Sequence, residues 1–535
     1  MTLISDPPVL QSSILHPFMG RDVSYLVDAR ARQRGDHPML VWAPYSGEGE
    51  TWSYARFAHD VARLAGGLYV RGVRAGDRVL VHFENCPETI LMRFACWRLG
   101  ATAVLGNSHW TGPEIAHAIS SLDVRAAVTQ PRFYARIVEH CPSLEWVAVS
   151  MTDAGETPEA APPKSDSFSA LYGEPLPRQP ADPTAPAVIL FTTGSTSRPK
   201  AVLWTHANLL WGGKVGALQQ GIRPEDIYQI HLPLFHVVGF TWSFIPAVWA
   251  GATTVLQPKF SASRYWPAAL RHRSTLSSHA GTDGFLRGLE VPTHHFRQWL
   301  HAWHDPARDA HFGLTGVAGW GMTEMVIPAI CSDGAFDQPT HSVGRPYPGY
   351  TARIEHQNGD HVAPGETGQL LIGAIRGLHI FQEYVDNPKA MAEAFDERGF
   401  FRTGDLVTLH EEGWIIYRER VKDMMKVGGE SVSASEVEAV VNEVPGVRET
   451  AVVSRPDPHY GEAIVAFVVL AEDAADRKTE VIEHIQAACQ ASLAKFKNPR
   501  VIEVVAEIPK IGNNKIHRPA LRELASRLKS PAQVR

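Results

Sequence analysis

Hydroxyl side chains gather around a glycine and precede a lysine between residues 191 and 202. The segment reads Phe-Thr-Thr-Gly-Ser-Thr-Ser-Arg-Pro-Lys-Ala-Val and follows an apolar run, 187–191, that is typical of a buried strand. Hydroxyls and backbone N–H groups on a turning loop can cradle an anion, and the ammonium of Lys200 adds a compact positive charge. The pattern lacks the second glycine of a Walker A loop. It predicts a phosphate site of another kind, with a polar surface loop as the alternative.

Two further segments combine glycine with acidic side chains. The first, 319–324, reads Gly-Trp-Gly-Met-Thr-Glu, and the second, 401–405, reads Phe-Arg-Thr-Gly-Asp. Glycines let the backbone approach a ligand closely, and the carboxylate of Glu324 is a hard oxygen ligand suited to Mg²⁺. The carboxylate of Asp405 accepts two hydrogen bonds, as a ribose diol requires. The alternatives are an ordinary turn around a buried tryptophan for the first segment and an Asx-turn for the second.

In the same order along nearly the whole chain, these segments resemble those of the AMP-forming acyl-CoA synthetases, adenylation domains and luciferases. Three more segments share the resemblance: His231–Gly239, Arg420–Glu430 and Pro509–Arg518. Each is weak by itself, so the resemblance rests on their collinearity. It implies a large N-terminal α/β domain, residues 1–419, with two sheet subdomains and a small β-rich subdomain. A small, mobile α+β domain, 420–535, would follow.

The resemblance also implies roles for residues of the large domain. His236 would lie near the substrate carboxylate, Glu324 would hold Mg²⁺ and Lys200 would contact phosphate. The remaining contacts with ATP would come from Thr192, Thr193, Gly194, Ser195, Thr196, Trp320, Gly321, Thr323 and Asp405.

In the small domain the resemblance divides the residues between two reaction steps. Arg420 would contact ribose, and Lys422 would stand at the hinge between the domains. Lys515 would bridge the substrate carboxylate and the α-phosphate during adenylation. Lys426, with the Gly428-Gly429 pair, would serve the thioester step. Rotation of the small domain would present each face to one active site in turn.

The chemistry follows from the poor leaving group of a carboxylate. Attack on the α-phosphorus of MgATP converts that leaving group to AMP and releases pyrophosphate, after which the thiol of CoA takes the acyl group. The obstacle is the approach of two anions, which Lys515, Lys200 and Mg²⁺ would relieve by electrostatic stabilisation. No nucleophilic side chain is required.

The sequence also departs from the family pattern. Ser197, Ala201, Glu419 and Asn514 replace glycines, and Leu300–Pro306 replaces a Gly-Gly-Ala-Pro-like segment. The same region is rich in histidine, so zinc is an alternative there. His301 and His304 are three residues apart and could share a helix face. The other histidines of the region are His294, His295 and His311.

Strand-like and helix-like segments alternate before the phosphate loop and after it. Residues 53–72 and 87–99 predict helices, and 77–83 and 101–105 predict strands, which together indicate a parallel α/β sheet. Residues 151–186 lack periodicity and predict a solvated linker. After Gly344, short strands and turn signals predict the β-rich subdomain.

The composition limits the other functions. A net charge of −6 and 20% charged residues describe a globular protein and give no reason to expect a nucleic-acid partner. Five scattered cysteines fit reduced thiols in the cytoplasm. The most apolar stretch, 240–256, contains Ser243, Pro246 and Gly251 and predicts buried core rather than a membrane span. We also expect a homodimer.

The best interpretation is an AMP-forming carboxylic acid–CoA ligase that uses ATP, Mg²⁺ and CoA. Phe240, Trp242 and Phe244 favour a hydrophobic acid, while Trp303 and Trp320 could flank the quaternary ammonium of a betaine-type acid. The alternatives are an enzyme that loads a separate carrier protein, a luciferase-like oxygenase and a non-catalytic nucleotide-binding relative.

Overall fold

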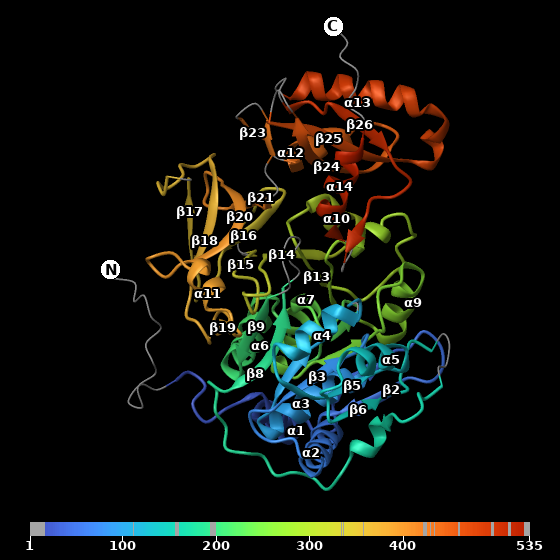
Figure 1. Cartoon of the computed structure of the whole chain (residues 1–535), viewed down its shortest axis with the longest axis vertical. Coiled ribbons are helices and arrows are strands. Elements are labelled where there is room, and N and C mark those ends of the chain that lie inside the picture. Colours follow the sequence, from blue (N-terminus) through green and yellow to red (C-terminus); the bar gives the residue numbers. More distant parts are fainter. Residues whose placement is uncertain are drawn as a thin grey trace. The chain divides into compact units, whose positions relative to one another are not determined.

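A computed structural model describes the chain except at its ends and in short internal segments. The described residues are 16–110, 112–155, 160–192, 200–332, 334, 336–356, 358–420, 425–427, 430–432, 434–457, 461–493, 497–511 and 515–528. They form two compact units (Figure 1). The first contains the described residues up to Thr192, those from Lys200 to Ala352, and Ile372–Phe401. The second contains Arg353–Leu371 and the described residues from Arg402 onward.

The first unit contains a sheet whose strands follow the order β19-β9-β8-β4-β3-β5-β6-β7. Strands β8, β4, β3, β5, β6 and β7 pair in parallel, and the antiparallel β9 and β19 extend the sheet beyond β8. Each residue of β4 is buried, as expected of a strand covered on both faces. The bounds are β3 (Arg78–His82), β4 (Thr102–Leu105), β5 (Val124–Thr129), β6 (Trp146–Val149), β7 (Asp166–Ser167), β8 (Pro186–Phe191), β9 (Ala201–Thr205) and β19 (Glu383–Tyr384).

A second run of strands in this unit follows the order β16-β15-β14-β13-β12-β10-β11-β1-β2. The block from β14 to β1 is parallel, so its carboxyl ends meet at one edge. The bounds are β1 (Pro38–Trp42), β2 (Glu50–Ser53), β10 (Ile227–Ile230), β11 (Thr253–Leu256), β12 (Leu276–Ser278), β13 (Gln298–His301), β14 (Thr315–Trp320), β15 (Ile330–Cys331) and β16 (Ser342–Pro346).

Helices of the first unit connect these strands. Gly66 and Gly67 of α2 lie against the chain at 171–174, where a Cβ atom would overlap backbone carbonyl oxygens. The helices are α1 (Val23–Arg34), α2 (Tyr54–Val70), α3 (Pro87–Leu99), α4 (Gly112–Ser120), α5 (Pro131–His140), α6 (His206–Gln219), α7 (Val237–Gly239), α8 (Ile245–Ala250), α9 (Ala262–His272), α10 (Pro306–Phe312) and α11 (Pro388–Ala394). A π-helical turn, 240–244, precedes α8, and short 3₁₀ helices lie at 168–171 and 282–285.

The second unit contains the strands β17-β18-β20-β21, a sheet β23-β22-β25-β24 with β26 beside β25, and the hairpin β27–β28. The bounds are β17 (Thr351–Glu355), β18 (Thr367–Gly373), β20 (Phe401–Leu409), β21 (Ile415–Arg420), β22 (Met425–Val427), β23 (Glu430–Val432), β24 (Val447–Asp457), β25 (Gly461–Leu470), β26 (Val501–Val504), β27 (Lys510–Ile511) and β28 (Lys515–Ile516). Its helices are α12 (Ala434–Asn442), α13 (Lys478–Ser492) and α14 (Arg518–Arg527).

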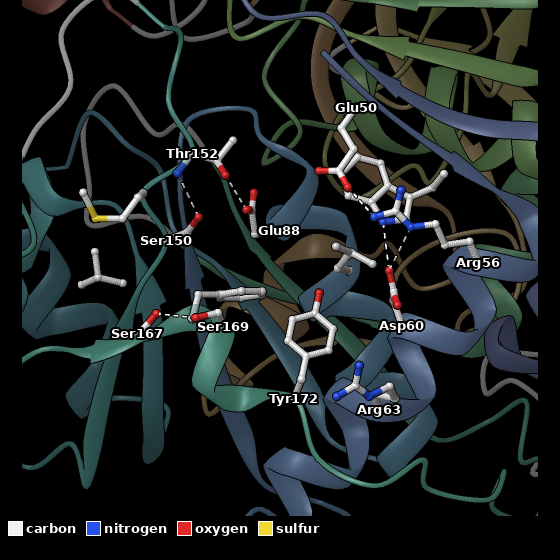
Figure 2. Close-up of a pocket in the computed structure, with 15 residues that line it drawn as sticks. Glu50, Arg56, Asp60, Arg63, Glu88, Ser150, Thr152, Ser167, Ser169 and Tyr172 are labelled. Carbon is white, nitrogen blue, oxygen red and sulfur yellow. Dashed lines mark hydrogen bonds and ion pairs between the residues drawn. The ribbon is translucent and has the colours of Figure 1, made fainter. Parts of the chain in front are cut away.

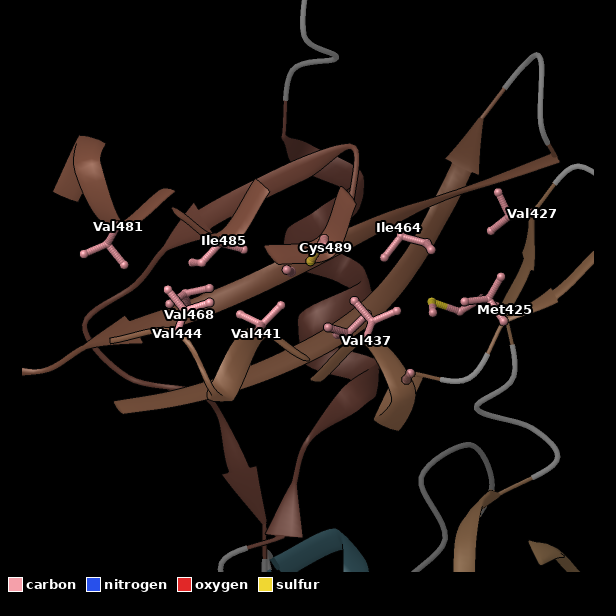
Figure 3. Close-up of a cluster of buried hydrophobic side chains, with 14 of the residues drawn as sticks. Met425, Val427, Val437, Val441, Val444, Ile464, Val468, Val481, Ile485 and Cys489 are labelled. Carbon is pink, nitrogen blue, oxygen red and sulfur yellow. The ribbon is translucent and has the colours of Figure 1, made fainter. Parts of the chain in front are cut away.

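Strand β25 shows how the sequence organises this unit. Ile464, Ala466 and Val468 pack in one cluster with residues of α12 and α13 (Figure 3). The intervening Val465 and Phe467 pack in another cluster with residues of α14. Because successive side chains of a strand point to opposite faces, an almost continuous apolar run serves two cores.

The predicted α/β architecture is confirmed, and the helices expected at 53–72 and 87–99 are α2 and α3. The prediction of a solvated linker at 151–186 is wrong in part, because Phe168 and Leu171 are buried there, and β7 and a 3₁₀ turn lie in the same stretch. Residues 240–256 are largely buried, as expected. None of the described helices combines the length and apolarity needed to cross a membrane.

Candidate active site

The ends of the predicted phosphate loop are held together by strand pairing. Strands β8 and β9 are antiparallel neighbours, with Phe191 opposite Ala201. The N–H of Thr192 donates to the carbonyl of Lys200 at 3.0 Å, and the N–H of Lys200 donates to Oγ1 of Thr192 at 3.1 Å. Thr193, Gly194, Ser195 and Thr196 lie outside the described residues. The register places Lys200 at the closing end of the loop.

Lys200 and Glu324 are brought together by a tyrosine that the sequence analysis did not single out. Strand β19 pairs with β9, with Tyr384 opposite Val202. The Nζ atom of Lys200 lies 4.1 Å from the centroid of the Tyr384 ring, and the hydroxyl of that tyrosine donates to Oε1 of Glu324 at 2.6 Å. The N–H of Phe381 also donates to the carbonyl of Glu324, at 2.9 Å. Tyr384 thus contacts the cation on its face and the carboxylate at its hydroxyl.

Glu324 has the properties of a magnesium ligand. Its side chain is buried, and Oε2 has no hydrogen-bond partner among the described residues. A buried carboxylate oxygen without a partner is costly unless a cation or donor meets it. Among the same residues, no group of three or more His, Cys, Asp or Glu could hold a metal. One carboxylate suits Mg²⁺, which keeps several waters and takes its other ligands from nucleotide phosphates.

The glycines of the turn before Glu324 are required by close packing. A Cβ atom on Gly321 would lie 2.7 Å from the ring of Trp242, and one on Gly319 would lie 3.0 Å from Pro328. Trp320 is buried at the end of β14, opposite Ile330 of β15. Thr323 is half-buried in the turn. The segment is therefore fixed between the π-helical turn and β15.

His236 lies immediately before α7, with its ring centroid 4.6 Å from that of Phe235. Its Nε2 atom is buried and has no hydrogen-bond partner among the described residues. Burial, with a smaller contribution from His109, lowers the pKa of His236 to about 4. The ring is therefore neutral near pH 7 and has a nitrogen left for a ligand.

Three other histidines meet at the carboxyl edge of the parallel strands. His231 follows β10, His279 follows β12 and His301 ends β13. Thr282 Oγ1 is hydrogen-bonded to both His231 Nε2, at 3.2 Å, and His279 Nδ1, at 2.9 Å. Tyr265 completes this histidine network with a 3.0 Å bond to His279. In the sequence, each histidine stands at the end of a short strand-like run. That pattern indicates a shared site only when the strands are known to be adjacent.

Burial keeps the histidine network uncharged. It lowers the pKa of His231 to about 3 and holds those of His279 and His301 well below their ordinary value of 6.5. The stacked rings of His279 and His301 have centroids 5.6 Å apart. The expectation that His301 and His304 share a helix face is wrong, because His301 ends a strand and His304 lies outside any helix.

The predicted residues of the second unit occupy three strand pairs. Asp405 of β20 lies opposite Arg420 of β21, is buried, and donates its N–H to Thr403 Oγ1 at 3.0 Å. Lys426 lies on β22 opposite Ser431, and Lys515 lies on β28 opposite Ile511. Lys422, Gly428 and Gly429 lie outside the described residues. The two lysines therefore belong to different hairpins.

Two family models match the chain. The AMP-binding enzyme model covers residues 27–282 and 301–385, and the model of the AMP-binding enzyme C-terminal domain covers residues 436–515. The unmatched residues 283–300 contain most of the chain between β12 and β13 and the first residues of β13, whereas nearly all of Leu300–Pro306 lies within the matched range. The chain therefore belongs to the AMP-binding enzyme family, as the collinear motifs indicated.

A curated relative agrees with this assignment, and two solved structures share the fold of the chain. The chain is 32% identical over 515 residues to the crotonobetaine/carnitine–CoA ligase of Salmonella typhi, which covers 93% of this chain and 98% of the relative. ATP-bound MatB from Rhodopseudomonas palustris has a TM-score of 0.83 at 23% identity, covering 95% of this chain and 99% of that one. The anthranilate CoA ligase AuaEII, in complex with anthranoyl-AMP, has a TM-score of 0.84 at 23% identity, covering 96% and 98%.

The family and the relatives confirm the predicted enzyme class. The chain is an ATP-dependent, AMP-forming acid–CoA ligase that works through an acyl adenylate with ATP, Mg²⁺ and CoA. The likeness to solved structures shows its fold: a large N-terminal α/β domain and a smaller C-terminal domain.

Proposed function

We propose that Lys200, Tyr384 and Glu324 receive the phosphates and magnesium of ATP in this enzyme. The observation that carries the proposal is the buried carboxylate of Glu324, with one oxygen bonded to Tyr384 and the other without a partner among the described residues. Tyr384 restrains the carboxylate, while the ammonium of Lys200 rests on the face of the same ring. A hard oxygen and a compact cation side by side are complementary to a metal-bound phosphate.

The remaining roles follow the family pattern. The hydroxyls and N–H groups of Thr192, Thr193, Gly194, Ser195 and Thr196 would hold phosphate oxygens; Trp320, Gly321 and Thr323 would contact the nucleotide; and Asp405 and Arg420 would hold ribose. Mg²⁺ supplies positive charge to the phosphates when it is bound. Lys515 would draw the substrate carboxylate toward the α-phosphate, and neutral His236 would orient that carboxylate by a hydrogen bond.

The thioester step would use other residues of the small domain. We assign the domain boundary to 419/420, with Lys422 at the hinge and with Lys426, Gly428 and Gly429 along the path of the CoA thiol. Lys426 and Lys515 lie on different hairpins, which supports separate duties. Lys515→Ala should abolish adenylation and spare CoA attack on supplied acyl adenylate, and Lys426→Ala should do the reverse. Half-reaction assays would contradict the division if both variants lost both steps equally.

The acid that the site favours is one with a quaternary ammonium group, of the crotonobetaine and carnitine class. The curated relative named above is a ligase for these acids. The histidine network and His236 are uncharged, so they do not repel a cation. The positive charge of Arg308, which acts on His279 and His301, is ion-paired with Asp309 at 3.1 Å. Trp242 and Trp320 are buried beside the turn before Glu324, and tryptophan faces attract such a cation. Trp303 is 45% exposed whereas Trp320 is 7% exposed, so support rests on Trp320 and Trp242 rather than on Trp303.

An ATP–pyrophosphate exchange screen tests both the ligase activity and the preference for a betaine-type acid. Crotonobetaine and carnitine should support exchange more strongly than hexanoate and benzoate. Greater exchange with the hydrophobic acids would overturn the betaine assignment and retain the ligase. ATP binding without exchange for any acid would favour a non-catalytic relative. Transfer to a carrier protein in preference to CoA would identify a carrier-loading enzyme.

We also propose a cytoplasmic homodimer that acts on small molecules without nucleic acid. The five cysteines are free and buried, which supports a reducing compartment. Light scattering of the purified protein at micromolar concentration measures the oligomeric state, and a monomer would contradict the dimer.

A further inference from the structure

A polar cavity of about 430 Å³ lies in the first unit and shares no lining residue with the candidate active site (Figure 2). Helix α2 contributes one wall, the first turn of α3 contributes Glu88, and the chain after β6 contributes Ser150 and Thr152. The 3₁₀ turn at 168–171 and the following Tyr172 close the other side. Nothing in the ligase reaction assigns a role to this cavity.

The backbone holds Tyr172 in position over α2. The N–H of Gly173 donates to the carbonyl of Arg63 at 3.0 Å, and Gly66 and Gly67 leave room for the carbonyls of residues 174 and 171. The guanidinium of Arg63 lies 5.6 Å from the centroid of the Tyr172 ring. In Figure 2 this ring lies between Arg63 and Glu88.

The charged groups of the cavity are unevenly paired. Arg56 forms ion pairs with both Glu50 and Asp60. Among the described residues, Arg63 has no carboxylate partner; its Nε donates to the carbonyl of Gly173 at 3.3 Å. Glu88 has no ion-pair partner there either. The guanidinium of Arg56 thus pairs with two carboxylates, while the guanidinium of Arg63 and the carboxylate of Glu88 have no ion-pair partner among the described residues.

Glu88 is the carboxylate of the cavity with a buried oxygen that lacks a partner among the described residues. Oε1 accepts the hydroxyl of Thr152 at 2.5 Å, and Oε2 is buried and lacks a hydrogen-bond partner among the described residues. The buried thiol of Cys86, a weak donor, lies beside this carboxylate. Burial and then the carboxylates of Asp60, Glu88 and Glu50 raise the pKa of Tyr172. The cavity is therefore acidic near the tyrosine hydroxyl and basic at Arg63.

We propose that this cavity binds a free basic amino acid of the lysine, ornithine and arginine class. Its carboxylate would pair with Arg63. The side-chain cation would meet Glu88, and the α-ammonium would meet the carboxylates of Glu50 and Asp60. Such a ligand supplies the charges that the cavity lacks, because it carries two cations and one anion near pH 7. Charge pairing of this kind fixes both the identity and the orientation of a small ligand.

Titration calorimetry of the full-length chain with three probes tests the proposal. L-lysine carries all three charges, L-norleucine lacks the side-chain ammonium, and cadaverine lacks the carboxylate. L-lysine should bind at least about tenfold more tightly than either of the others, since leaving a charged partner unpaired costs well over 1 kcal/mol. Equal affinity of L-lysine and L-norleucine, or no heat with L-lysine, would overturn the proposal.

Two variants assign the binding to this cavity. Glu88→Gln should reduce the affinity for L-lysine to that of L-norleucine while leaving the affinity for L-norleucine unchanged, and pyrophosphate exchange should be retained. Glu139→Gln is the matched control, because Glu139 is an exposed glutamate on α5 that does not line the cavity. An unchanged preference for L-lysine in Glu88→Gln would contradict the assignment.

Arg63→Gln gives an independent result if Glu88→Gln fails to fold. It should reduce the affinity for L-lysine to that of cadaverine and leave cadaverine binding unchanged. Tight L-lysine binding by a folded Arg63→Gln protein would overturn the proposed orientation. Circular dichroism of each variant establishes that it is folded.

Discussion

Glu324 and Glu88 have the same local hydrogen-bond pattern in two different regions of the first unit. In each, Oε1 accepts a hydroxyl, from Tyr384 at 2.6 Å or from Thr152 at 2.5 Å, and Oε2 is buried without a partner among the described residues. Their surroundings differ. Glu324 shares a tyrosine with Lys200, whereas Glu88 lies in the first turn of a helix beside an open cavity. A carboxylate's own bonds therefore do not define its role; the cations near it do.

Replacing Glu324 should have the largest effect. Glu324→Gln keeps an acceptor for Tyr384 but removes the charge offered to Mg²⁺, so pyrophosphate exchange should fall about 1,000-fold, equivalent to several kcal/mol of charge stabilisation. The apparent Mg²⁺ requirement should rise in the same assay. Glu88→Gln is the control and should change exchange by less than about threefold. Equal losses of exchange in the two variants would show that Glu324 and Glu88 do not differ in their role in catalysis.

Tyr384→Phe should have the next largest effect on activity. The substitution removes the hydrogen bond to Glu324 and keeps the ring beneath Lys200. Because a hydrogen bond to a charged group contributes about 1.5–3 kcal/mol, exchange should fall roughly 10- to 100-fold. The measurement is the exchange rate at saturating acid and varied Mg²⁺. Wild-type exchange at every Mg²⁺ concentration would show that Tyr384 does not orient the carboxylate.

Acid should destabilise the first unit through its neutral histidines. The pKa of His231 is about 3 and that of His236 about 4, against 6.5 in the unfolded chain. Between those values the unfolded state binds more protons, so stability falls as pH decreases from about 6.5 toward 4. The melting temperature measured across that range should drop, and less steeply in His231→Gln. An identical slope in that variant would contradict the burial of a neutral ring.

Thr152→Val should have the smallest effect on activity, and it tests the hydrogen bond to Glu88 as Tyr384→Phe tests the one to Glu324. It removes the hydroxyl bonded to Glu88, as Tyr384→Phe does for Glu324. The free energy of unfolding should decrease by about 1–3 kcal/mol, measured by urea denaturation, because a buried acceptor loses its donor. Pyrophosphate exchange by the folded variant should match wild type. A loss of exchange comparable to that of Tyr384→Phe would link this cavity to catalysis.

The sequence by itself determined the local elements and the family. Apolar runs predicted the strands at 77–83 and 101–105, and the order of short motifs identified the enzyme class. Lys200 and Glu324 were recognised because glycine, hydroxyl and acidic residues recur at short spacings. Such signals are local, since they depend on strand and helix periodicity and on neighbours within a few residues.

Only the tertiary structure decided which distant residues meet. Tyr384 reaches Glu324 because β19 pairs with β9 in one register, and a shift of one residue would turn its side chain to the other face. The histidine network exists because β10, β12 and β13 end at the same edge, although its members are up to seventy residues apart. Glu88 likewise acquires its surroundings from α2 and from the chain around Tyr172. Contacts of this range depend on sheet order and register, which short-range sequence patterns do not encode.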